Sequence, residues 1–583
     1  MDEIYAWMNS WSNKKIKKDK NFKELITYEG VSLWWFADRW LRENDMYLTK
    51  LVSVQQIINY LNDPKNEINN KTGDEINREL SEKFLKDINI NKIKLTAIYH
   101  LINLKQYFRY YYLKIFKRNS LIEEKLGGKK ILIISESGCY RTKIDPITKK
   151  ESKIDEYFEP IIKELKRRDY TLKVIDVDFT PKINLNDLRE KNAPSWGFYE
   201  QYLNKTISLK VNCERKKLEE LWKKLKVNKE FINSFDYEIK NKKINIYPYL
   251  KDSFSAIFKY RFPEAVKRIE TIKRMIEIET PDLVLLQGEA DSFGRCAVTA
   301  AKLRGIPVVA ILHGLLSPYN CAYMHSKDDI SSEGSIKYTY CPIPDKTAVY
   351  GPCDTKTLTE IHAYPEDSVI VTGQPRYDSL ARAKEIYNKE KTFEKLNLDK
   401  NKRLIVWATN SYIFNESSKK DIYAVFDSIK KISDDFQLII KKHPGYYMDD
   451  SVYNKIYQEK FGIHPLITKE ADTSELLYAS DLVIIEDSTV GIEAIILGKP
   501  VIRINFSGHQ EVMPYVSSGA ALGCYKEEDL IIDIKKALYD KETKEKLKNA
   551  REKFSYEYAY LPDGKATERV CNLIEEMIKE SKK

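Results

Sequence analysis

The chain has 583 residues, of which 43% are hydrophobic and 32% charged, a composition typical of a soluble globular protein. This length predicts more than one domain, because single cores rarely grow beyond about 250–300 residues. The 97 basic and 87 acidic residues leave a net charge of +10, a mixed surface that does not favour nucleic acid as a partner. The eight cysteines form no CxxC pair, no signal peptide opens the chain, and no run is apolar enough to span a membrane. We therefore expect a cytoplasmic protein without a zinc site or disulfides.

Residues 1–125 are predicted to form a helical, aromatic-rich extension. Five of the eight tryptophans lie in the first forty residues, and the segment 101–119 mixes apolar, aromatic and basic residues at helical spacing. Two interpretations stay open: the rings form the core of a helical subdomain, which we prefer, or the basic aromatic helix lies on an anionic membrane surface. Glu29 precedes Gly30, and we expect this turn to face the main cleft and reach an acceptor.

Residues 126–380 are predicted to form a first Rossmann-like domain. Buried-strand patterns at 131–134 and 172–177 flank a helical pattern at 156–168, as in a doubly wound sheet. The polar loop after the first strand lacks the spaced glycines of a dinucleotide site, so NAD binding is not expected. The Lys-rich stretch at about 183–270 breaks the alternation and predicts an inserted helical layer on the acceptor side.

Polar residues follow two further strand patterns of this domain. The strand at 282–286 ends in Gln287 and Glu289, and the strand at 308–312 ends in His313 and Gly314. Because parallel strands end at the same edge of a sheet, we expect these side chains to be near neighbours beside a cleft. An imidazole with a pKa of about 6.5 suits the removal of a proton from a hydroxyl, so His313 is the first candidate for a general base, with Glu289 as the second.

Residues 381–535 are predicted to form a second Rossmann-like domain, followed by closing helices at 536–583. Strand patterns at 403–408 and 436–440 lead to a third at 482–485. A polar turn, a helical pattern through Leu497 and a strand at 501–504 come next, and such a short crossover implies parallel strands. The helix is expected to open at Asp487 or Ser488, where free N–H groups would favour an anion.

The run EDSTVGIEAIILGKPVI resembles the donor-binding segment of two-domain glycosyltransferases of the GT-B type. It is closest to the branch that makes surface polysaccharides and teichoic-acid-like polymers, and it is also similar to UDP-N-acetylglucosamine 2-epimerase. The resemblance covers about 129–560 and implies an α/β fold with two Rossmann-like domains facing a cleft. Many retaining members carry two acids eight residues apart across this turn, whereas Glu486 and Glu493 are seven apart, which argues against retention.

The resemblance also implies roles for individual residues. Diphosphate would lie at Ser488 and Thr489, and Glu493 would accept hydrogen bonds from ribose. A Gly-x-Pro-Arg-x-Asp segment contains Arg376, which would counter a phosphate. The predicted site residues are, for catalysis, His313, Glu289 and His443; for the donor, Lys441, Ser488, Thr489, Glu493 and Arg376; and for the acceptor or support, Gln287, Gly314 and Glu29.

We therefore predict a nucleotide-sugar-dependent glycosyltransferase that moves a sugar, or a polyol phosphate, to a hydroxyl in surface polysaccharide or glycoconjugate biosynthesis. The expected partners are the nucleotide-activated donor, a glycan or lipid-linked acceptor, and the inner face of a membrane through the N-terminal helices. No metal and no cofactor are expected, although Asp328 and Asp329 keep the metal question open. The alternatives are a sugar-nucleotide 2-epimerase or hydrolase, and a non-catalytic scaffold of a membrane-associated assembly complex.

Overall fold

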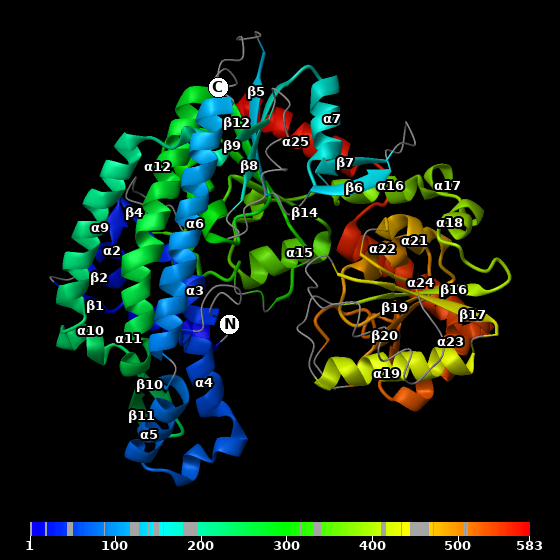
Figure 1. Ribbon diagram of the computed structural model, residues 1–583, viewed down its shortest axis with the longest axis horizontal. Coiled ribbons are helices and arrows are strands. Elements are labelled where there is room, and N and C mark those ends of the chain that lie inside the picture. Colours follow the sequence, from blue (N-terminus) through cyan, green and yellow to red (C-terminus); the bar gives the residue numbers. More distant parts are fainter. Residues whose placement is uncertain are drawn as a thin grey trace.

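The fold is known from a computed structural model that describes most of the chain. The described residues are 3–17, 20–43, 51–86, 88–116, 128–136, 140–144, 151–155, 157–178, 196–314, 316–318, 320, 322–330, 340–409, 416–432, 434–443, 466–469, 471–506, 508 and 511–582. They form two parallel sheets with helices packed on them, and a helical region built around α6 and α12 flanks the first sheet (Figure 1). The predicted α/β class with two Rossmann-like sheets is confirmed.

The N-terminal sheet has seven described strands in the order β15-β14-β13-β12-β5-β8-β9, all parallel. Its central strands are short apolar runs that are buried on both faces, which is typical of parallel sheets covered by helices. Leu286 pairs with both Ile134 and Ala310, so β5, β12 and β13 end at one edge. The strands are β5 (Lys130–Glu136), β8 (Thr171–Val177), β9 (Trp196–Phe198), β12 (Leu283–Leu286), β13 (Val308–Ile311), β14 (Lys346–Val349) and β15 (Val369–Val371).

The C-terminal sheet has six described strands in the order β18-β17-β16-β19-β20-β21, also all parallel. The four residues of β19 are buried, as its run of leucine, valine and isoleucine predicts. The strands are β16 (Arg403–Ala408), β17 (Phe436–Lys441), β18 (Leu466–Thr468), β19 (Leu482–Ile485), β20 (Val501–Ile504) and β21 (Leu522–Cys524). The helices of this half are α18 (Lys389–Lys395), α19 (Glu416–Lys431), α21 (Thr473–Ala479), α22 (Val490–Ile496) and α23 (Leu530–Tyr539).

Two C-terminal helices tie the halves together. Helix α24 (Lys541–Ala559) contacts α22 of the second half and α15 (Pro352–Lys356) of the first. A side chain at Gly351 would collide with the backbone of Glu557, so this approach requires glycine. Helix α25 (Ala566–Glu580) lies beside α7 (Glu159–Arg167) in the core under the N-terminal sheet (Figure 1). The Asp378 carboxylate accepts from the first amides of α25 and fixes its start.

The N-terminal extension and the insertion share one aromatic core. The ring of Trp11 lies 4.6 Å from that of Phe235, and the ring of Phe22 stacks at 5.6 Å on Phe231. Trp34 is buried with them, so the core interpretation is confirmed for these rings. The extension contains α1 (Glu3–Ser12), β1 (Lys15–Lys17), β2 (Lys20–Asn21), α2 (Phe22–Leu25), β3 (Thr27–Tyr28), β4 (Val31–Ser32), η1 (Leu33–Phe36), α3 (Asp38–Glu43), α4 (Val54–Asn62) and α5 (Gly73–Phe84). The insertion contains α9 (Lys205–Leu225), α10 (Lys229–Asn233), β10 (Asp236–Ile239), β11 (Lys242–Asn245), α11 (Tyr247–Ala256) and α12 (Phe262–Glu279).

Helix α6 (Ile88–Phe116) follows this pattern only in part, because some of its buried side chains are polar or charged. Lys105 pairs with Asp178 at 2.5 Å and Arg109 with Glu200 at 2.9 Å, and all four are buried. The outward face instead carries large apolar residues, namely Ile90, Ile93, Leu101, Leu104, Tyr107, Phe108, Tyr111 and Ile115. The core interpretation therefore holds for Leu95 and Leu113, which are buried in hydrophobic clusters, and not for the exposed apolar face of this helix. In the described part of the chain, no helix is long and apolar enough to cross a membrane.

The remaining described elements complete the first half. A two-stranded antiparallel ribbon follows β5, and short helices connect the later strands to each other and to the second half. These elements are β6 (Tyr140–Ile144), β7 (Glu151–Asp155), α13 (Ser292–Lys302), α14 (Lys327–Ile330), η9 (Pro375–Tyr377), α16 (Asp378–Ala381) and α17 (Ala383–Ile386).

Candidate active site between the two sheets

His313 follows β13 and is held by two tyrosines. Its backbone carbonyl accepts from the hydroxyls of Tyr157 at 2.6 Å and Tyr350 at 2.9 Å. Its exposed ring lies parallel to the ring of Tyr157, with centroids 5.2 Å apart and planes 18° apart. Desolvation by the surrounding protein lowers the pKa of His313, and the charge of Arg376 lowers it further, against an opposing effect of Asp291. The imidazole is therefore neutral at pH 7 and able to accept a proton.

Arg376 lies on the short turn η9, next to His313. Its guanidinium lies over the rings of Tyr157 and Tyr377, at 5.4 and 5.1 Å from their centroids, and donates to both hydroxyls at 3.5 and 3.3 Å. Its Nε has no hydrogen-bond partner among the described residues. Burial disfavours its charge, but the pKa of Arg376 is raised overall by neighbours that include Glu493. One cation thus acts on His313 of the first half and interacts with Glu493 of the second.

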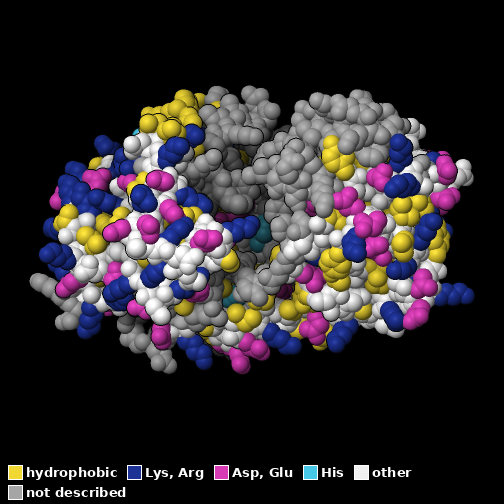
Figure 2. Space-filling view, turned by 90° about the horizontal axis from the view of Figure 1, so that it is seen from below, with side chains coloured by type: hydrophobic (Ala, Val, Ile, Leu, Met, Phe, Trp, Pro, Cys, Tyr) yellow, Lys and Arg dark blue, Asp and Glu magenta, His cyan; other side chains and the backbone are white. Residues whose placement is uncertain are grey.

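Thr489 and Glu493 of the second half lie on the side of the cleft opposite Arg376. Both are partly exposed, and Glu493 also acts on the pKa of Tyr350 and Tyr377, two residues of the first half. Thr489 precedes α22 and makes no side-chain cap to it. The walls of the two halves therefore meet around Arg376, and Figure 2 shows the surface hollowed between the halves.

Ser488 and the start of the helix differ from the prediction. Helix α22 begins at Val490, not at Asp487 or Ser488, and covers two turns. The Ser488 side chain is buried, and its hydroxyl accepts from the Val490 amide at 3.3 Å. Asp487 forms two hydrogen bonds, of 2.9 and 2.8 Å, with Arg503. Local partners therefore hold this turn, and Thr489 is its more accessible hydroxyl.

Lys441 ends β17 and His443 follows this strand, but the two residues face different surroundings. Lys441 is buried, and its amine donates to the Lys469 carbonyl at 2.7 Å. Its predicted role beside a diphosphate is corrected: it fixes the loop after β18. His443 is exposed, and its backbone amide donates to the Thr409 hydroxyl at 3.4 Å. The residues that follow it, from Pro444, lie outside the described part.

Glu289 lies beneath the site rather than on its wall. Only 2% of it is exposed, and it accepts from the Tyr364 hydroxyl at 2.6 Å. Burial raises the pKa of Glu289. An acceptor hydroxyl cannot reach this carboxyl, so the geometry favours His313 as the base. Gln287 and Gly314 are partly exposed at the ends of β12 and β13, beside His313 as the strand order requires.

Two further predicted positions lie away from this wall. Glu29 sits in the β3–β4 turn and pairs with Lys273 of α12 at 2.6 Å, so this turn faces the helical region and not the cleft. Asp329 is buried and pairs with Lys23 at 2.6 Å, which gives it a structural role. Among the described residues, no cluster of three or more histidine, cysteine or acidic side chains could hold a metal ion.

Sequence reasoning missed an acid pair at the same sheet edge. Glu136, the last residue of β5, is influenced by Asp291, which caps α13 by accepting from the Gly294 amide at 2.5 Å. Burial and then Asp291 raise the pKa of Glu136 to about 7. Asp291 also acts on His313. The position of Glu136 at the end of a buried strand was the signal that pointed to this edge.

Residues 301–576 match the sequence model of the family described as CDP-Glycerol:Poly(glycerophosphate) glycerophosphotransferase. The chain is also 24% identical over 220 residues to the teichoic acid glycerol-phosphate primase of Bacillus subtilis (strain 168). The predicted resemblance is confirmed. This alignment covers 36% of the chain and 52% of the primase, so the chain spans about half the length of that relative. The matched family is one of transferases, as predicted, but its description names no nucleotide-sugar donor.

Three solved structures illustrate what the chain is similar to, each at low sequence identity. The UDP-GlcNAc 2-epimerase of Neisseria meningitidis bound to UDP-GlcNAc is 17% identical, with a TM-score of 0.47 over 77% of this chain and all of that one (100%). A variant of the wall teichoic acid polymerase TagF is 13% identical, with a TM-score of 0.43 over 82% of this chain and 98% of that one. A putative UDP-N-acetylglucosamine 2-epimerase from Listeria monocytogenes is 15% identical, with a TM-score of 0.47 over 78% of this chain and 98% of that one.

Proposed function

We propose that this chain transfers a polyol phosphate from a nucleotide-activated donor to a hydroxyl of a cell-surface polymer. The observation that carries the proposal is that the charge of Arg376 lowers the pKa of His313, while Glu493 on the opposite wall helps to raise the pKa of Arg376. A neutral base, a fixed cation and an acid suited to a ribose diol are the groups that such a transfer needs. The matched transferase family supports the same reading.

The proposed chemistry is a displacement at phosphorus. The acceptor hydroxyl loses its proton to the imidazole of His313, and its oxygen forms a bond to the phosphorus that carries the polyol. The bond from this phosphorus to the nucleotide oxygen breaks, and a nucleoside monophosphate leaves with the electron pair. Arg376 offsets the charge that develops, the Thr489 hydroxyl donates a hydrogen bond to the nucleotide phosphate, and His443 donates a hydrogen bond to the leaving group.

The donor is proposed to be a CDP-activated polyol, because the matched family is described by CDP-glycerol. A nucleotide sugar, our prediction from the sequence, remains the second candidate. A sugar donor would require attack at carbon, with departure of a nucleoside diphosphate. The two donors therefore release different products, and this difference makes the choice testable.

A binding screen and a product assay test the function together. We expect CDP and CMP to raise the melting temperature by about 5 °C at 100-fold excess over Kd, and UDP, GDP and dTDP to do so less. With CDP-glycerol and a glycerol-phosphate primer, CMP should be released only when the primer is present. Isomerisation of UDP-N-acetylglucosamine without an acceptor would instead identify an epimerase. The absence of any nucleotide effect would favour the scaffold alternative.

We further propose that the outer face of α6 binds the inner face of an anionic membrane. Ile93 and Ile115 are 70% and 66% exposed, and the helix has no acidic residue. Lys94 and Lys114 are exposed on the same helix. Apolar side chains flanked by lysines are what an interfacial helix presents to anionic lipid.

Flotation with vesicles tests this surface in the full-length chain. We expect the chain to bind vesicles that contain about 30% anionic phosphatidylglycerol. The double variant Ile93→Ser/Phe108→Ser should lose this binding. Leu209→Ser is the matched control, because Leu209 is equally exposed on α9. Equal flotation of all three proteins would remove α6 from the membrane contact.

A further inference from the structure

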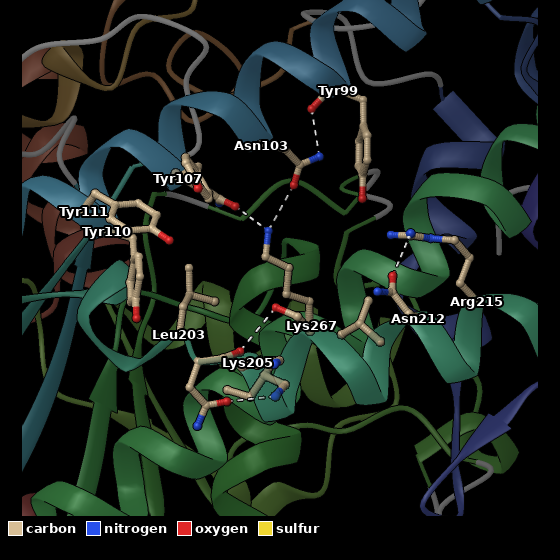
Figure 3. Close-up of a pocket in the computed structure, with 15 residues that line it drawn as sticks. Tyr99, Asn103, Tyr107, Tyr110, Tyr111, Leu203, Lys205, Asn212, Arg215 and Lys267 are labelled. Carbon is tan, nitrogen blue, oxygen red and sulfur yellow. Dashed lines mark hydrogen bonds between the residues drawn. The ribbon is translucent and has the colours of Figure 1, made fainter. Parts of the chain in front are cut away.

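A pocket of about 520 Å³ opens between α6, α9 and α12, within the helical region (Figure 3). Four tyrosines of α6 and three cations contribute to its wall, and none of the lining residues is acidic. This composition differs from the mixed surface of the chain as a whole. The lining residues are Tyr99, Asn103, Gln106, Tyr107, Tyr110, Tyr111, Leu203, Asn204, Lys205, Ile207, Ser208, Val211, Asn212, Arg215 and Lys267.

Lys267 orders the amides of the wall. It reaches from α12 to α6, where its amine donates to Asn103 Oδ1 at 3.2 Å and to Gln106 Oε1 (Figure 3). A lysine amine can only donate, so these contacts set the oxygen of each amide toward Lys267 and the nitrogen away from it. The Nε2 of Gln106 has no hydrogen-bond partner among the described residues. Gln106 is only 2% exposed, so water in bulk solvent does not replace this partner.

An orphan donor of this kind is rare in folded proteins, because burying it without a partner is unfavourable. A bound molecule could supply the missing acceptor after a small movement of the Gln106 side chain toward the pocket. The pocket that Gln106 lines is open and large enough for several hydroxyl-bearing groups. The orphan amide is thus a second observation, independent of charge, that points to a ligand.

The charges indicate an anionic ligand. Arg215 donates to Asn212 at 3.0 Å and has no acidic partner in an ion pair within the described part. Lys267 lies 3.5 Å from Glu264, but the same carboxylate also pairs with Arg268 at 3.3 Å. One acid therefore serves two cations, and the wall keeps a positive excess.

The tyrosines indicate a ligand with hydroxyls and short apolar stretches. Tyr107 and Tyr111 have ring centroids 4.5 Å apart and are both exposed, and they belong to the outer face of α6 as well as to the pocket. Tyrosine rings provide flat apolar contact and a hydroxyl that both donates and accepts. Together with the amides, they suit a polyol or sugar backbone that carries phosphate.

We propose that this pocket binds a phosphate-bearing, hydroxyl-rich unit of the acceptor polymer, outside the place of transfer. The inference rests on the proposed function for the identity of the polymer, but the pocket itself is independent of the cleft residues. Lys267 and Arg215 contact phosphate, and Gln106 donates to a hydroxyl or phosphate oxygen. The site would hold the polymer while its end reaches His313.

Binding of a synthetic glycerol-phosphate trimer to the full-length protein, measured by calorimetry, tests the pocket without turnover. Lys267→Met removes the donor that orders the amides, and Arg215→Met removes a cation at a partly exposed position where misfolding is a smaller concern. We expect each to weaken trimer binding at least about tenfold, the effect of losing one charge-assisted contact. Lys251→Met, at an exposed lysine of α11 outside the pocket, should bind as wild type.

The inference is overturned if both variants bind the trimer as tightly as wild type, or if inorganic phosphate binds as tightly as the trimer. It is also overturned if the protein binds phosphatidylglycerol vesicles but not the trimer, because the ligand of the pocket would then be a lipid headgroup. The melting-temperature shift with CDP should be the same in all variants. If the trimer binds through Lys267 while CDP-glycerol is never consumed, the pocket stands and the proposed transfer fails. If transfer proceeds with an unchanged KM for long primers in both variants, the pocket fails and the transfer stands.

Discussion

The two walls of the cleft are built differently. On the N-terminal wall, two tyrosine hydroxyls hold the carbonyl of His313, and Arg376 lies between two rings. On the C-terminal wall, Thr489, Glu493 and His443 are partly or fully exposed. The groups proposed for chemistry thus lie on a wall fixed by tertiary contacts, and those proposed for the donor lie on a wall that solvent reaches. Reacting groups need fixed geometry more than binding groups do.

The largest effect is expected at the N-terminal wall. His313→Asn should lower kcat by about 10³-fold, because a general base contributes about 10²–10⁴-fold, while the CDP-induced melting shift should stay unchanged. Steady-state release of CMP measures the loss. His100→Asn, an exposed histidine of α6, is the control. A variant at His313 that retains full turnover would remove the base from this wall.

Arg376 tests whether both walls depend on one cation. Arg376→Lys keeps the charge but loses the planar group that lies over Tyr157 and Tyr377, and kcat/KM should fall by about 10²-fold. Arg382→Lys, at an exposed arginine paired with Glu385, should leave kcat/KM unchanged. Equal kcat/KM values for the two variants would mean that Arg376 only supports the fold.

Glu493 should behave as a binding group of the C-terminal wall. Glu493→Gln keeps the size of the side chain and weakens its acceptance from ribose hydroxyls, so the Kd for CDP should rise by about tenfold with kcat changed by less than about threefold. Calorimetry and saturating kinetics separate the two quantities. A large loss of kcat at unchanged Kd would place Glu493 in the chemical step and erase the contrast between the walls.

The smallest effect concerns the acid pair of the N-terminal wall. The pKa of Glu136 is raised from 4.5 to about 7, so the folded chain binds more protons than the unfolded chain between these values. Stability should therefore fall as pH rises through this window. Glu136→Gln should raise the melting temperature at pH 8 by about 2 °C and leave it unchanged at pH 4. The exposed Glu219→Gln should show no such dependence; an equal response of both would contradict the pairing.

The sheets were readable from the sequence because each buried strand is a short apolar run. The runs at 403–408, 482–485 and 501–504 match β16, β19 and β20 residue for residue, and the order of the strands brings His313 beside Gln287. The family resemblance was also readable, from the segment around α22. These features depend on local pattern and on one topological rule.

The rest depended on partners far away in the chain. Periodicity shows that α6 has two faces but not which face is buried. The charged face is buried here because Lys105 pairs with Asp178 and Arg109 pairs with Glu200. Lys441 and Glu289 lie at strand ends that point toward the cleft. However, the Lys441 amine donates to a backbone carbonyl, and the Glu289 carboxylate accepts from a tyrosine hydroxyl. The stack of Tyr157 on His313 joins positions 156 residues apart, and no local pattern announces it.

Helix α25 has a consequence for how the protein is made. It supplies Val570, Ile574 and Ile578 to the core under the first sheet, although it is synthesised after all the described strands of the second sheet. During translation the first sheet exposes apolar surface until α25 has been synthesised. Nascent chains in such a state aggregate or bind chaperones. Expression of residues 126–380 alone should therefore give insoluble material, and adding residues 566–580 in trans or by circular permutation should rescue it.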